Sequence, residues 1–191
     1  MNNKYILLRH GETRYQAKKL DVLYPKDENP GLPITENGKK KIEIVAKELK
    51  NKGIDLIYSS DYFRTKQTSK IIAEELGLDI KFDSRLIDTN FGTFHGKTGE
   101  EYRKFFSDRK ERFFKRPAQG ENWRDVGKRA VAVITEIEKE HNNKTILIVS
   151  HADPIWLLAG YLKGLSEDEL LEQRHIGGFW PDVGQYFEVG A

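Results

Sequence analysis

The sequence contains no cysteine. This absence excludes disulfide bonds, thiolate catalysis and cysteine-ligated zinc, and it permits a reducing compartment. The chain also has no apolar run long enough to span a bilayer and no signal-peptide core after Met1, so we expect a cytoplasmic protein without a membrane partner. The formal net charge is only +2, from 32 basic and 30 acidic residues. This small charge gives no general argument for nucleic-acid binding.

What the chain does contain is typical of a folded domain. Apolar residues make up 38% and aromatic residues 11% of the 191 positions, unlike the composition of a disordered chain. A domain of this size buries about 70% of its unfolded surface. There is no internal repeat, low-complexity tract or linker, and we therefore predict one domain over residues 1–191.

Short apolar runs alternate with amphipathic stretches. The predicted strands are residues 6–8, 55–59, 78–82, 145–149 and 186–189. The predicted helices are residues 36–52, 62–76, 122–141 and 154–164. Residues 15–33 lack periodicity and predict a loop, and residues 83–121 predict an insertion over the sheet with one or two short helices. The alternation favours parallel βαβ units, so the expected class is α/β, a three-layer α/β/α fold with a mainly parallel central sheet.

The first apolar run stops abruptly on Arg9, His10 and Gly11. Open α/β sheets place their ligand crevices at the carboxyl ends of strands, which is where these residues fall. A guanidinium group suits phosphate or carboxylate oxygens, and a neutral imidazole can serve as nucleophile, base or metal ligand. Gly11 lets another group approach the backbone closely. For the tripeptide alone, ordinary polar residues at a strand end are the better explanation, because Arg-His-Gly is common by chance.

Further polar side chains follow the other predicted strands. Arg64 lies in the first turn of the helix after the second strand, Asp88 in the loop after the third, and His151 directly after the fourth. The carboxyl ends of parallel strands meet at one edge of a sheet. We therefore expect these side chains to converge with Arg9 and His10.

Six pieces of the sequence, in order, resemble the histidine phosphatase superfamily, also known as the phosphoglycerate-mutase-like family. They span residue 5 to about residue 163, and each alone is a weak signal. The pieces are Leu8-Arg9-His10-Gly11-Glu12-Thr13, Leu32-Pro33-Ile34-Thr35 with Gly38, Ser59 to Thr68, Leu86 to Gly92 with Gly96, Gly120-Glu121, and Val149-Ser150-His151. The resemblance implies the phosphoglycerate-mutase-like fold, with residues 83–121 as an insertion over the active site.

The resemblance implies that His10 is the nucleophile that forms a phosphohistidine, and that Arg9, Arg64 and His151 bind the phosphate. An imidazole with a pKa of about 6.5 is largely neutral at pH 7 and needs no separate base. Its other ring nitrogen needs an acceptor, for which we expect a nearby backbone carbonyl. Phosphoryl transfer depends mainly on positioning and charge stabilisation. Water regenerates the enzyme, so no metal or organic cofactor is implied.

The family's acidic position falls on Asp88, where this branch more commonly has glutamate. Aspartate is shorter, which affects proton delivery or the place of the leaving group. Asp153 is the alternative acid, because another branch places its acid directly after the late histidine, with a spacing that differs here by one residue. We favour Asp88 and expect a raised carboxyl pKa in the true acid. Gln16 stands where the family usually has a phosphate-contacting asparagine, and the usual Gly-aromatic piece between Lys18 and Pro30 is missing.

The remaining polar residues of these pieces carry weaker predictions. Glu12 and Glu121 are interpreted as supports behind the site, although Glu12 is equally consistent with an exposed turn carboxylate. His95, His141 and His175 have no paired ligand spacing, so we predict no metal site.

The stretch from Lys97 to Arg116 is locally basic, with a net charge of +4 and two interleaved phenylalanine pairs. In the family this insertion lies over the pocket, which favours a polyanionic or bulky phosphorylated substrate. A solvated helical face with its phenylalanines packed on the sheet explains the pattern equally well.

These expectations predict a cofactor-independent phosphomonoesterase of the histidine acid phosphatase type, acting through phospho-His10 on a small phosphorylated metabolite. A phosphoglycerate mutase is the nearest competing function, but mutases of this resemblance are usually longer, with a carboxyl-terminal tail that shields the phosphoenzyme from water. A phosphoprotein phosphatase or a catalytically weak phospho-ligand binding module would also fit these residues. The sequence makes no prediction of oligomeric state.

Overall fold

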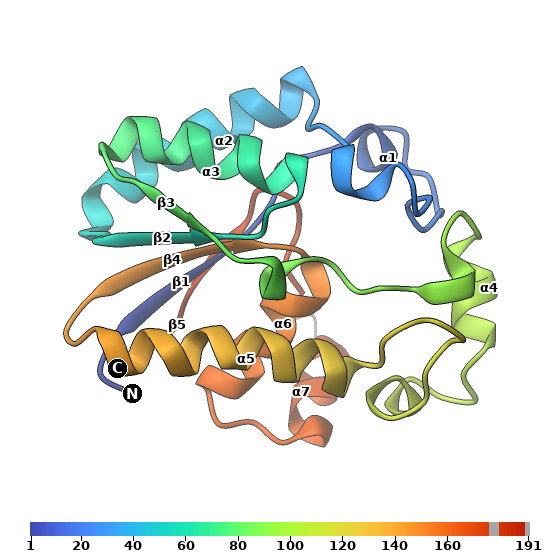
Figure 1. The fold of residues 1–191 in the computed structure, drawn as a ribbon. Helices are drawn as coiled ribbons and strands as arrows, with labels where there is room; N and C mark the ends of the chain where they lie inside the picture. Colours follow the sequence, from blue (N-terminus) through green and yellow to red (C-terminus); the bar gives the residue numbers. More distant parts are fainter. Residues whose placement is uncertain (176–179, 190–191) are drawn as a thin grey trace.

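The computed structural model describes residues 1–175 and 180–189, which form three layers around one five-stranded sheet (Figure 1). The strands are β1 (Lys4–Arg9), β2 (Leu56–Ser59), β3 (Ile80–Phe82), β4 (Thr145–Ser150) and β5 (Tyr186–Val189). The helices are α1 (Arg14–Ala17), α2 (Glu36–Leu49), α3 (Phe63–Leu76), α4 (Gly99–Lys104), α5 (Trp123–Glu140), α6 (Ala152–Leu162) and α7 (Glu167–His175). The predicted three-layer α/β/α class is confirmed.

The strand order β3-β2-β4-β1-β5 brings the ends of three strands together. The strands β3, β2, β4 and β1 are parallel, and β5 runs antiparallel to β1 at the edge. The last residue of β1, Arg9, lies opposite Ser150 of β4, and the last residue of β2, Ser59, lies opposite Val149. The chain therefore leaves β1, β2 and β4 at the same edge, where an open α/β sheet forms its ligand crevice.

The two faces of the sheet carry separate hydrophobic clusters, because successive side chains of a strand point to opposite sides. In β1, Tyr5 and Leu7 pack with residues of α5 and α6, whereas Ile6 and Leu8 pack with residues of α2 and α3. Figure 1 shows α2 and α3 above the sheet and α5, α6 and α7 below it. The predicted inward face of α5 is buried: Trp123, Val126, Ala130, Val133, Ile134 and Ile137.

Local sequence signals fix the ends of the helices. The side chain of Thr35 accepts a hydrogen bond from the backbone N–H of Gly38 at 2.9 Å and so caps the start of α2. Gly77 ends α3 with a φ of 68°, in the left-handed region that favours glycine. Both ends fall where the sequence predicts them.

Residues 15–33 are not the continuous loop that their lack of periodicity predicts. They include most of α1 and a short 3-10 helix at Asn29–Gly31. The side chain of Gln16 accepts from the backbone N–H of Thr13, and the Thr13 side chain caps the first turn in return. This capping box explains α1. A helix of one turn is too short for periodicity to reveal it.

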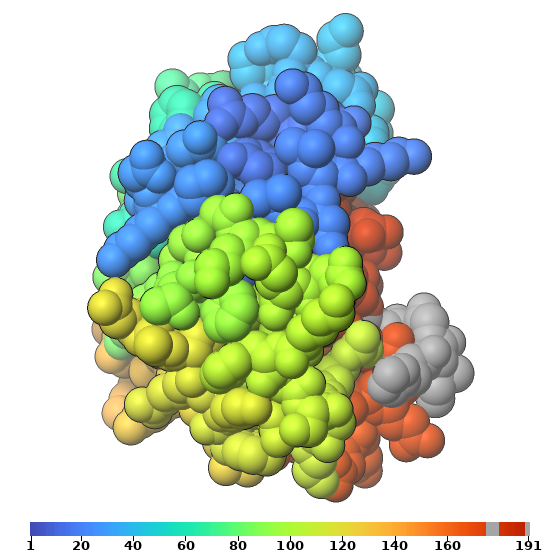
Figure 2. All heavy atoms as spheres, turned by 90° about the vertical axis from the view of Figure 1, so that its right-hand side faces the viewer, coloured from blue at the N-terminus to red at the C-terminus, as the bar shows by residue number. Residues whose placement is uncertain are grey.

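Residues 83–121 connect β3 to α5 along the edge where the strands end. They form α4 and more short helices than expected, with 3-10 turns at Ser84–Leu86, Gly92–Phe94 and Lys110–Phe113. Backbone hydrogen bonds join this segment to the first loop, from Leu23 to Lys97 and from Gly99 to Asp21. Figure 2 shows the segment, in green and yellow-green, covering the middle of this face beside the blue residues of the first loop.

Candidate active site

The structure brings five side chains together at the carboxyl edge of the sheet. The imidazole rings of His10, after β1, and His151, after β4, have centroids 5.3 Å apart. Asp88 reaches them from the loop after β3, with its Oδ2 3.8 Å from Nδ1 of His151 and 3.0 Å from Nη2 of Arg64. Arg9, at the end of β1, lines the adjoining cavity together with Asp88.

His10 is buried, and the backbone fixes one of its ring nitrogens. Nδ1 lies 2.8 Å from the carbonyl oxygen of Gly11, which can only accept, so we assign the proton to Nδ1 and a lone pair to Nε2. Burial lowers the pKa of His10 well below its usual value, and the positive charges of Arg64 and Arg9 add to this effect. At pH 7 the imidazole is therefore neutral, with an unprotonated Nε2 suited to nucleophilic attack.

Gly11 lets α2 and α3 pack closely against the turn that carries His10. A Cβ at this position would lie 3.0 Å from Cγ1 of Ile42 on α2, which is tighter than ordinary contact. The backbone N–H of Gly11 donates to the hydroxyl of Thr68 on α3 at 3.0 Å. That hydroxyl donates to the carbonyl of Arg64 at 2.7 Å. The turn after β1 and the arginine of α3 are thereby held in one arrangement.

Two guanidinium groups stand beside the histidines. Arg64 is fully buried and donates to the backbone carbonyl of Asn29 at 2.7 Å as well as to Asp88. Arg9 donates to the carbonyl of Pro181 at 2.9 Å. Nε of each arginine is buried and has no hydrogen-bond partner among the described residues. Such unpaired buried donors are rare, and a bound oxyanion would supply their partner.

Ser60, directly after β2, holds the ring of His151. Its Oγ lies 2.9 Å from Nε2 of His151 and accepts from the backbone N–H of Tyr62. We assign the Ser60 hydroxyl as donor to Nε2, which leaves the proton of neutral His151 on Nδ1. Burial, followed by the charge of Arg64, lowers the pKa of His151 well below its usual value. His151 thus offers a neutral N–H donor beside His10.

The two candidate acids have different surroundings. Burial raises the pKa of Asp88, the charge of Arg64 opposes this, and the charge of Asp153 reinforces it. The Oδ2 atom of Asp153 accepts from the hydroxyl of Thr89 at 2.9 Å and from Nη2 of Arg112 at 3.3 Å. Both carboxyl groups are paired, Asp88 with Arg64 and Asp153 with Thr89 and Arg112, and Asp88 has the raised pKa expected of a general acid.

Gln16 lines the cavity, but its amide is already bonded on both sides. Its Nε2 donates to the hydroxyl of Tyr24, and its Oε1 accepts from Thr13. Glu12 accepts from the hydroxyl of Thr35 at 2.9 Å and so connects the turn after β1 to the start of α2. Gln16 thus lies at the cavity wall, while Glu12 supports the turn from behind.

Glu121 contacts the loop of Asp88 through an arginine. Nε of Arg129, on α5, lies 2.8 Å from Oε1 of Glu121. The same guanidinium group donates to the backbone carbonyls of Arg85, Ile87 and Asp88 at 2.7, 2.7 and 2.9 Å. The pair of Glu121 and Arg129 therefore fixes the backbone that presents the Asp88 carboxyl group.

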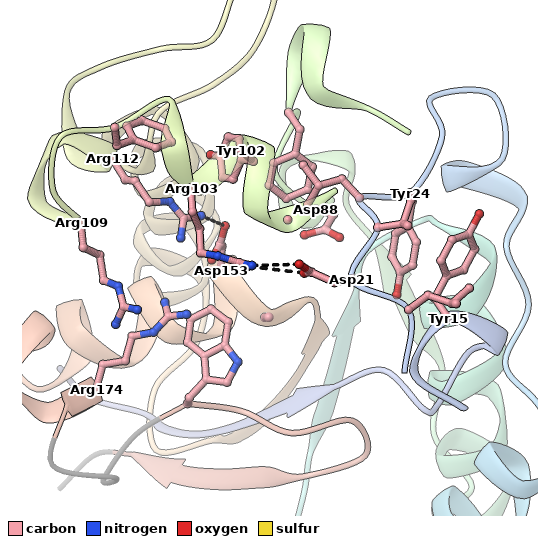
Figure 3. Close-up of a pocket in the computed structure, with 18 of the residues that line it drawn as sticks. Tyr15, Asp21, Tyr24, Asp88, Tyr102, Arg103, Arg109, Arg112, Asp153 and Arg174 are labelled. Atoms are coloured by element: carbon pink, nitrogen blue, oxygen red, sulfur yellow. Dashed lines mark hydrogen bonds and ion pairs between the residues drawn. The ribbon is translucent and has the colours of Figure 1, made fainter. Parts of the chain in front are cut away.

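A cavity of about 670 Å³ opens beside the clustered residues. Figure 3 shows Tyr15 and Tyr24 on one side of it, Asp88 near the middle, and several arginines on the opposite side. These arginines are Arg103, Arg109, Arg112 and Arg174.

Much of the basic charge between Lys97 and Arg116 is paired. The pairs are Arg103–Asp21, Lys104–Glu100, Lys110–Asp168, Arg112–Asp153, Lys115–Glu111 and Arg116–Asp125. Phe106 and Phe113 are buried, whereas Phe114 is exposed. Most of these pairs lie at the surface, whereas Arg103, Arg109 and Arg112 line the cavity. The preference for a polyanionic substrate stays a prediction.

Within residues 1–175 and 180–189, no group of three or more histidine, cysteine, aspartate or glutamate side chains is placed to hold a metal ion. The side chain of His175, for which no ligand role was predicted, lies outside the described residues. Over the same described ranges, none of the helices combines the length and apolar character needed to cross a bilayer.

The sequence analysis assigns no individual site role to four residues: Ser60, Thr68, Arg112 and Arg129. Ser60 did carry a usable signal, because it follows a strand at the same edge as His10 and His151. Arg112 and Arg129 are two arginines in a chain with 32 basic residues, and only the fold brings them to the acidic loop.

The chain is similar to known proteins in sequence and in fold. The model of the histidine phosphatase superfamily (branch 1) matches residues 5–177. Phosphoserine phosphatase 1 of Hydrogenobacter thermophilus is 31% identical over 159 residues, which cover 80% of this chain and 72% of that protein. The 2,3-bisphosphoglycerate-dependent phosphoglycerate mutase of Bartonella henselae is 27% identical over 190 residues, which cover 93% of this chain and 90% of that protein. The fold is similar to that of a mycobacterial glucosyl-3-phosphoglycerate phosphatase, with a TM-score of 0.80 at 20% identity, over 98% of this chain and 89% of that one.

Proposed function

This chain belongs to the histidine phosphatase superfamily, and on that basis we propose that it is a phosphomonoesterase that hydrolyses small phosphorylated metabolites through a phosphohistidine at His10. The observation that carries the proposal is the state of His10. Its ring is buried and neutral, its Nδ1 is bonded to a carbonyl, and its Nε2 is left unprotonated beside two arginines and a second histidine.

The reaction has two balanced steps. In the first, Nε2 of His10 attacks phosphorus, the N–P bond forms, the P–O bond to the alcohol breaks, and the departing oxygen takes a proton from Asp88. In the second, a water molecule attacks the phosphorus of the phosphohistidine and gives a proton to Asp88. The new O–P bond forms, the N–P bond breaks with its electron pair returning to Nε2 of His10, and inorganic phosphate leaves. Neither step requires a metal ion or an organic cofactor.

Arg9, Arg64 and His151 stabilise the three equatorial oxygens of the transferred group. The unpaired Nε atoms of the two arginines and the Nδ1 proton of His151 support this role, because all three lie in a buried site where charge-assisted hydrogen bonds are strong. Arg64 is also paired with the carboxylate of Asp88, so phosphate binding and the protonation state of the acid are connected.

Asp88 is the better candidate for the general acid. Each of the two carboxyl groups is bonded to an arginine, but Asp88 also lies beside the paired histidines, with its Oδ2 3.8 Å from Nδ1 of His151, and burial raises its pKa. Gln16 contributes less to phosphate binding than the asparagine that the family usually has at this position. Its amide group already bonds to Tyr24 and to Thr13.

A phosphoglycerate mutase is the second candidate, because the Bartonella henselae mutase matches nearly the whole chain at 27% identity. Both reactions pass through phospho-His10 and differ in the acceptor of the phosphoryl group. Water is the acceptor in the hydrolase, and a second hydroxyl group of a phosphorylated substrate is the acceptor in the mutase.

The test is to trap the intermediate. The protein is mixed with ³²P-labelled phenyl phosphate, quenched in base, digested and analysed for acid-labile label on the peptide that contains His10. The variants are His10→Gln and, as a matched control at the end of α5, His141→Gln. We expect label and steady release of inorganic phosphate in the wild type and in His141→Gln, and neither in His10→Gln.

The fate of the label separates the candidates. Label that moves to added 2- or 3-phosphoglycerate faster than it appears as inorganic phosphate supports the mutase. Absence of both label and turnover in the wild type, with inorganic phosphate still bound, contradicts the proposed enzyme and supports a binding module instead.

A further inference from the structure

We propose that the hydroxyl group of Tyr24 donates a hydrogen bond to an oxygen of the phosphoryl group at His10, which makes Tyr24 a further catalytic residue of the site. The proposal rests on the proposed function, because the phosphoryl group is the one that His10 accepts. Two features of Tyr24 lead to it. The side chain lies beside the arginines of the site, and its hydroxyl proton has no close acceptor among the described residues.

Tyr24 lies beside both arginines that we assign to phosphate binding. The guanidinium carbon of Arg64 is 4.7 Å from the centroid of the Tyr24 ring. Arg9, Asp88 and Tyr24 line the same cavity (Figure 3). Burial lowers the pKa of Arg9, and Tyr24 is the first of the nearby groups that oppose this effect. An oxyanion held between the two arginines would therefore lie within reach of the Tyr24 side chain.

The ring of Tyr24 is held from several sides. Tyr24 is only 7% exposed, and the ring of Tyr15 meets its ring edge-on, with centroids 4.9 Å apart. The guanidinium group of Arg64 lies over the ring, and the backbone carbonyl of Tyr24 accepts from Nδ1 of His95 at 2.8 Å. None of these contacts involves the hydroxyl group, so they would keep the ring in place in a variant that lacks it.

A short chain of hydrogen bonds makes the hydroxyl oxygen of Tyr24 an acceptor. The backbone N–H of Thr13 can only donate, and it lies 3.0 Å from Oε1 of Gln16, which identifies that atom as the amide oxygen. The amide nitrogen, Nε2 of Gln16, must then donate to the hydroxyl oxygen of Tyr24. The proton of Tyr24 is therefore left for another acceptor.

That proton has no close acceptor in the part of the chain that the structure describes. The one candidate is Oγ1 of Thr13 at 3.4 Å, which is beyond the usual length of an O–H···O hydrogen bond. Thr13 already gives its own hydroxyl proton to Oε1 of Gln16 at 2.7 Å. A phosphate oxygen beside Arg9 and Arg64 would supply the missing acceptor, and such a bond to an anion in a buried site is strong.

In the proposed reaction Tyr24 keeps its proton. Its O–H group stabilises the charge on the equatorial oxygens while His10 attacks phosphorus, together with Arg9 and Arg64. The phosphoryl group is common to all substrates. The contribution of Tyr24 should therefore be similar for good and poor leaving groups, whereas that of Asp88 depends on the leaving group.

Tyr24→Phe tests the proposal, because it removes the hydroxyl group and keeps the ring. We would measure kcat/KM for phenyl phosphate and p-nitrophenyl phosphate, and the affinity for inorganic phosphate by calorimetry. The matched control is Tyr58→Phe. Tyr58 is also 7% exposed, but it lies on β2 and its hydroxyl oxygen accepts from Nζ of Lys81 at 3.3 Å.

We expect Tyr24→Phe to lower kcat/KM for both substrates, and the affinity for inorganic phosphate, by about 10- to 100-fold, the effect of one hydrogen bond to a charged group. Tyr58→Phe should leave all three quantities close to those of the wild type. Unchanged kcat/KM in Tyr24→Phe overturns the proposal and leaves the phosphatase intact.

Gln16→Met separates donation to phosphate from mere support of Gln16. If Tyr24 acts only by holding the Gln16 amide, Tyr24→Phe should cause no further loss when Gln16→Met is already present. Donation to phosphate predicts a loss of similar size in that background, because Tyr15, Arg64 and His95 still hold the ring. A loss that disappears in the Gln16→Met background therefore overturns the proposal.

The affinity for inorganic phosphate makes the test independent of turnover. If the wild type hydrolyses neither substrate, the proposed function fails. A weaker affinity for phosphate in Tyr24→Phe, but not in Tyr58→Phe, then still supports the hydrogen bond from Tyr24. Equal affinities in the wild type and Tyr24→Phe, or no binding of phosphate by the wild type, overturn it in that case.

Discussion

Nη2 of Arg64 lies 3.0 Å from Oδ2 of Asp88, so the cation that we propose to bind phosphate also holds the proposed acid. Arg64 is the main group that lowers the pKa of Asp88, against burial that raises it. In the proposed reaction, a phosphoryl group at His10 would draw this cation toward its own oxygens. The pKa of Asp88 would then rise further, so that substrate binding itself would favour the protonated form that can donate to the leaving oxygen.

The effect of replacing Asp88 on kcat should depend on the leaving group of the substrate. Asp88→Asn keeps the shape but cannot donate a carboxyl proton, so we expect kcat for alkyl phosphates to fall by about 10²- to 10⁴-fold. The loss for p-nitrophenyl phosphate should be much smaller, because nitrophenolate leaves without a proton. In the wild type, kcat for alkyl phosphates should decline as pH rises through the raised pKa of Asp88, and Asp88→Asn should lack this alkaline limb.

Asp153→Asn is the matched control for this experiment. If Asp88 is the acid, Asp153→Asn should lower kcat for both kinds of substrate by similar factors. The reverse pattern, with leaving-group dependence in Asp153→Asn alone, would move the acid role to Asp153.

Ser60→Ala should disturb catalysis through the tautomer of His151. Without the hydroxyl, Nε2 of His151 loses its partner at 2.9 Å, and the ring proton can move from Nδ1 to Nε2. We expect kcat/KM to fall about tenfold, which corresponds to about 1.4 kcal/mol. The ¹⁵N chemical shifts of the His151 ring report the tautomer directly.

Ser59→Ala supplies the control for Ser60→Ala. Ser59 is equally buried, and its hydroxyl donates to the backbone carbonyl of Ser60 at 2.9 Å. If the loss of any buried hydroxyl lowers kcat/KM, the decrease should appear in both Ser60→Ala and Ser59→Ala. A shift of the His151 nitrogens in Ser59→Ala alone would contradict the assigned role of Ser60.

Periodicity and strand-end position were enough to predict the layers and the place of the site. The apolar run at 145–149 has no polar face, which is what a parallel strand covered on both sides requires, and β4 lies in the centre of the sheet. His10 and His151 follow neighbouring strands in register, so their proximity follows from the topology. The one-turn helix α1 was missed because only its capping residues, Thr13 and Gln16, mark it.

The cavity wall could not be predicted in the same way. Arg112 and Arg174 come from segments with no shared periodicity, and they meet only because 3-10 turns and α7 fold over the sheet edge. The net charge between Lys97 and Arg116 can be counted from the residues alone. Counting does not tell which of those charges face outward in ion pairs, as Lys104 does with Glu100, and which line the cavity.

Arg129→Met should destabilise the loop that carries Asp88. Three backbone carbonyls and Glu121 lose their common donor, and a buried acceptor left without a partner costs about 1–3 kcal/mol. We expect urea unfolding to show a loss of roughly 2–4 kcal/mol in the free energy of unfolding. Turnover of alkyl phosphates should fall more than that of p-nitrophenyl phosphate, because the position of Asp88 is affected.

Arg124→Met is the control for Arg129→Met, since Arg124 is an exposed arginine of the same helix, paired with Glu167. It should change stability by well under 1 kcal/mol, as exposed ion pairs do. Equal losses for both substrates in Arg129→Met would show that this arginine stabilises the fold without positioning the acid.

The two buried histidines should make stability depend on pH below about 6.5, the ordinary pKa of histidine in an unfolded chain. Burial lowers the pKa values of His10 and His151 in the folded state, so between those values and 6.5 the unfolded chain binds more protons. The free energy of unfolding therefore falls as pH falls through this window, by up to about 2 kcal/mol per histidine between pH 7 and pH 5. Urea unfolding at both pH values should show a smaller loss in His10→Gln and in His151→Gln than in the wild type or in His141→Gln. An equal loss in all four proteins would mean that neither ring is held neutral by the fold.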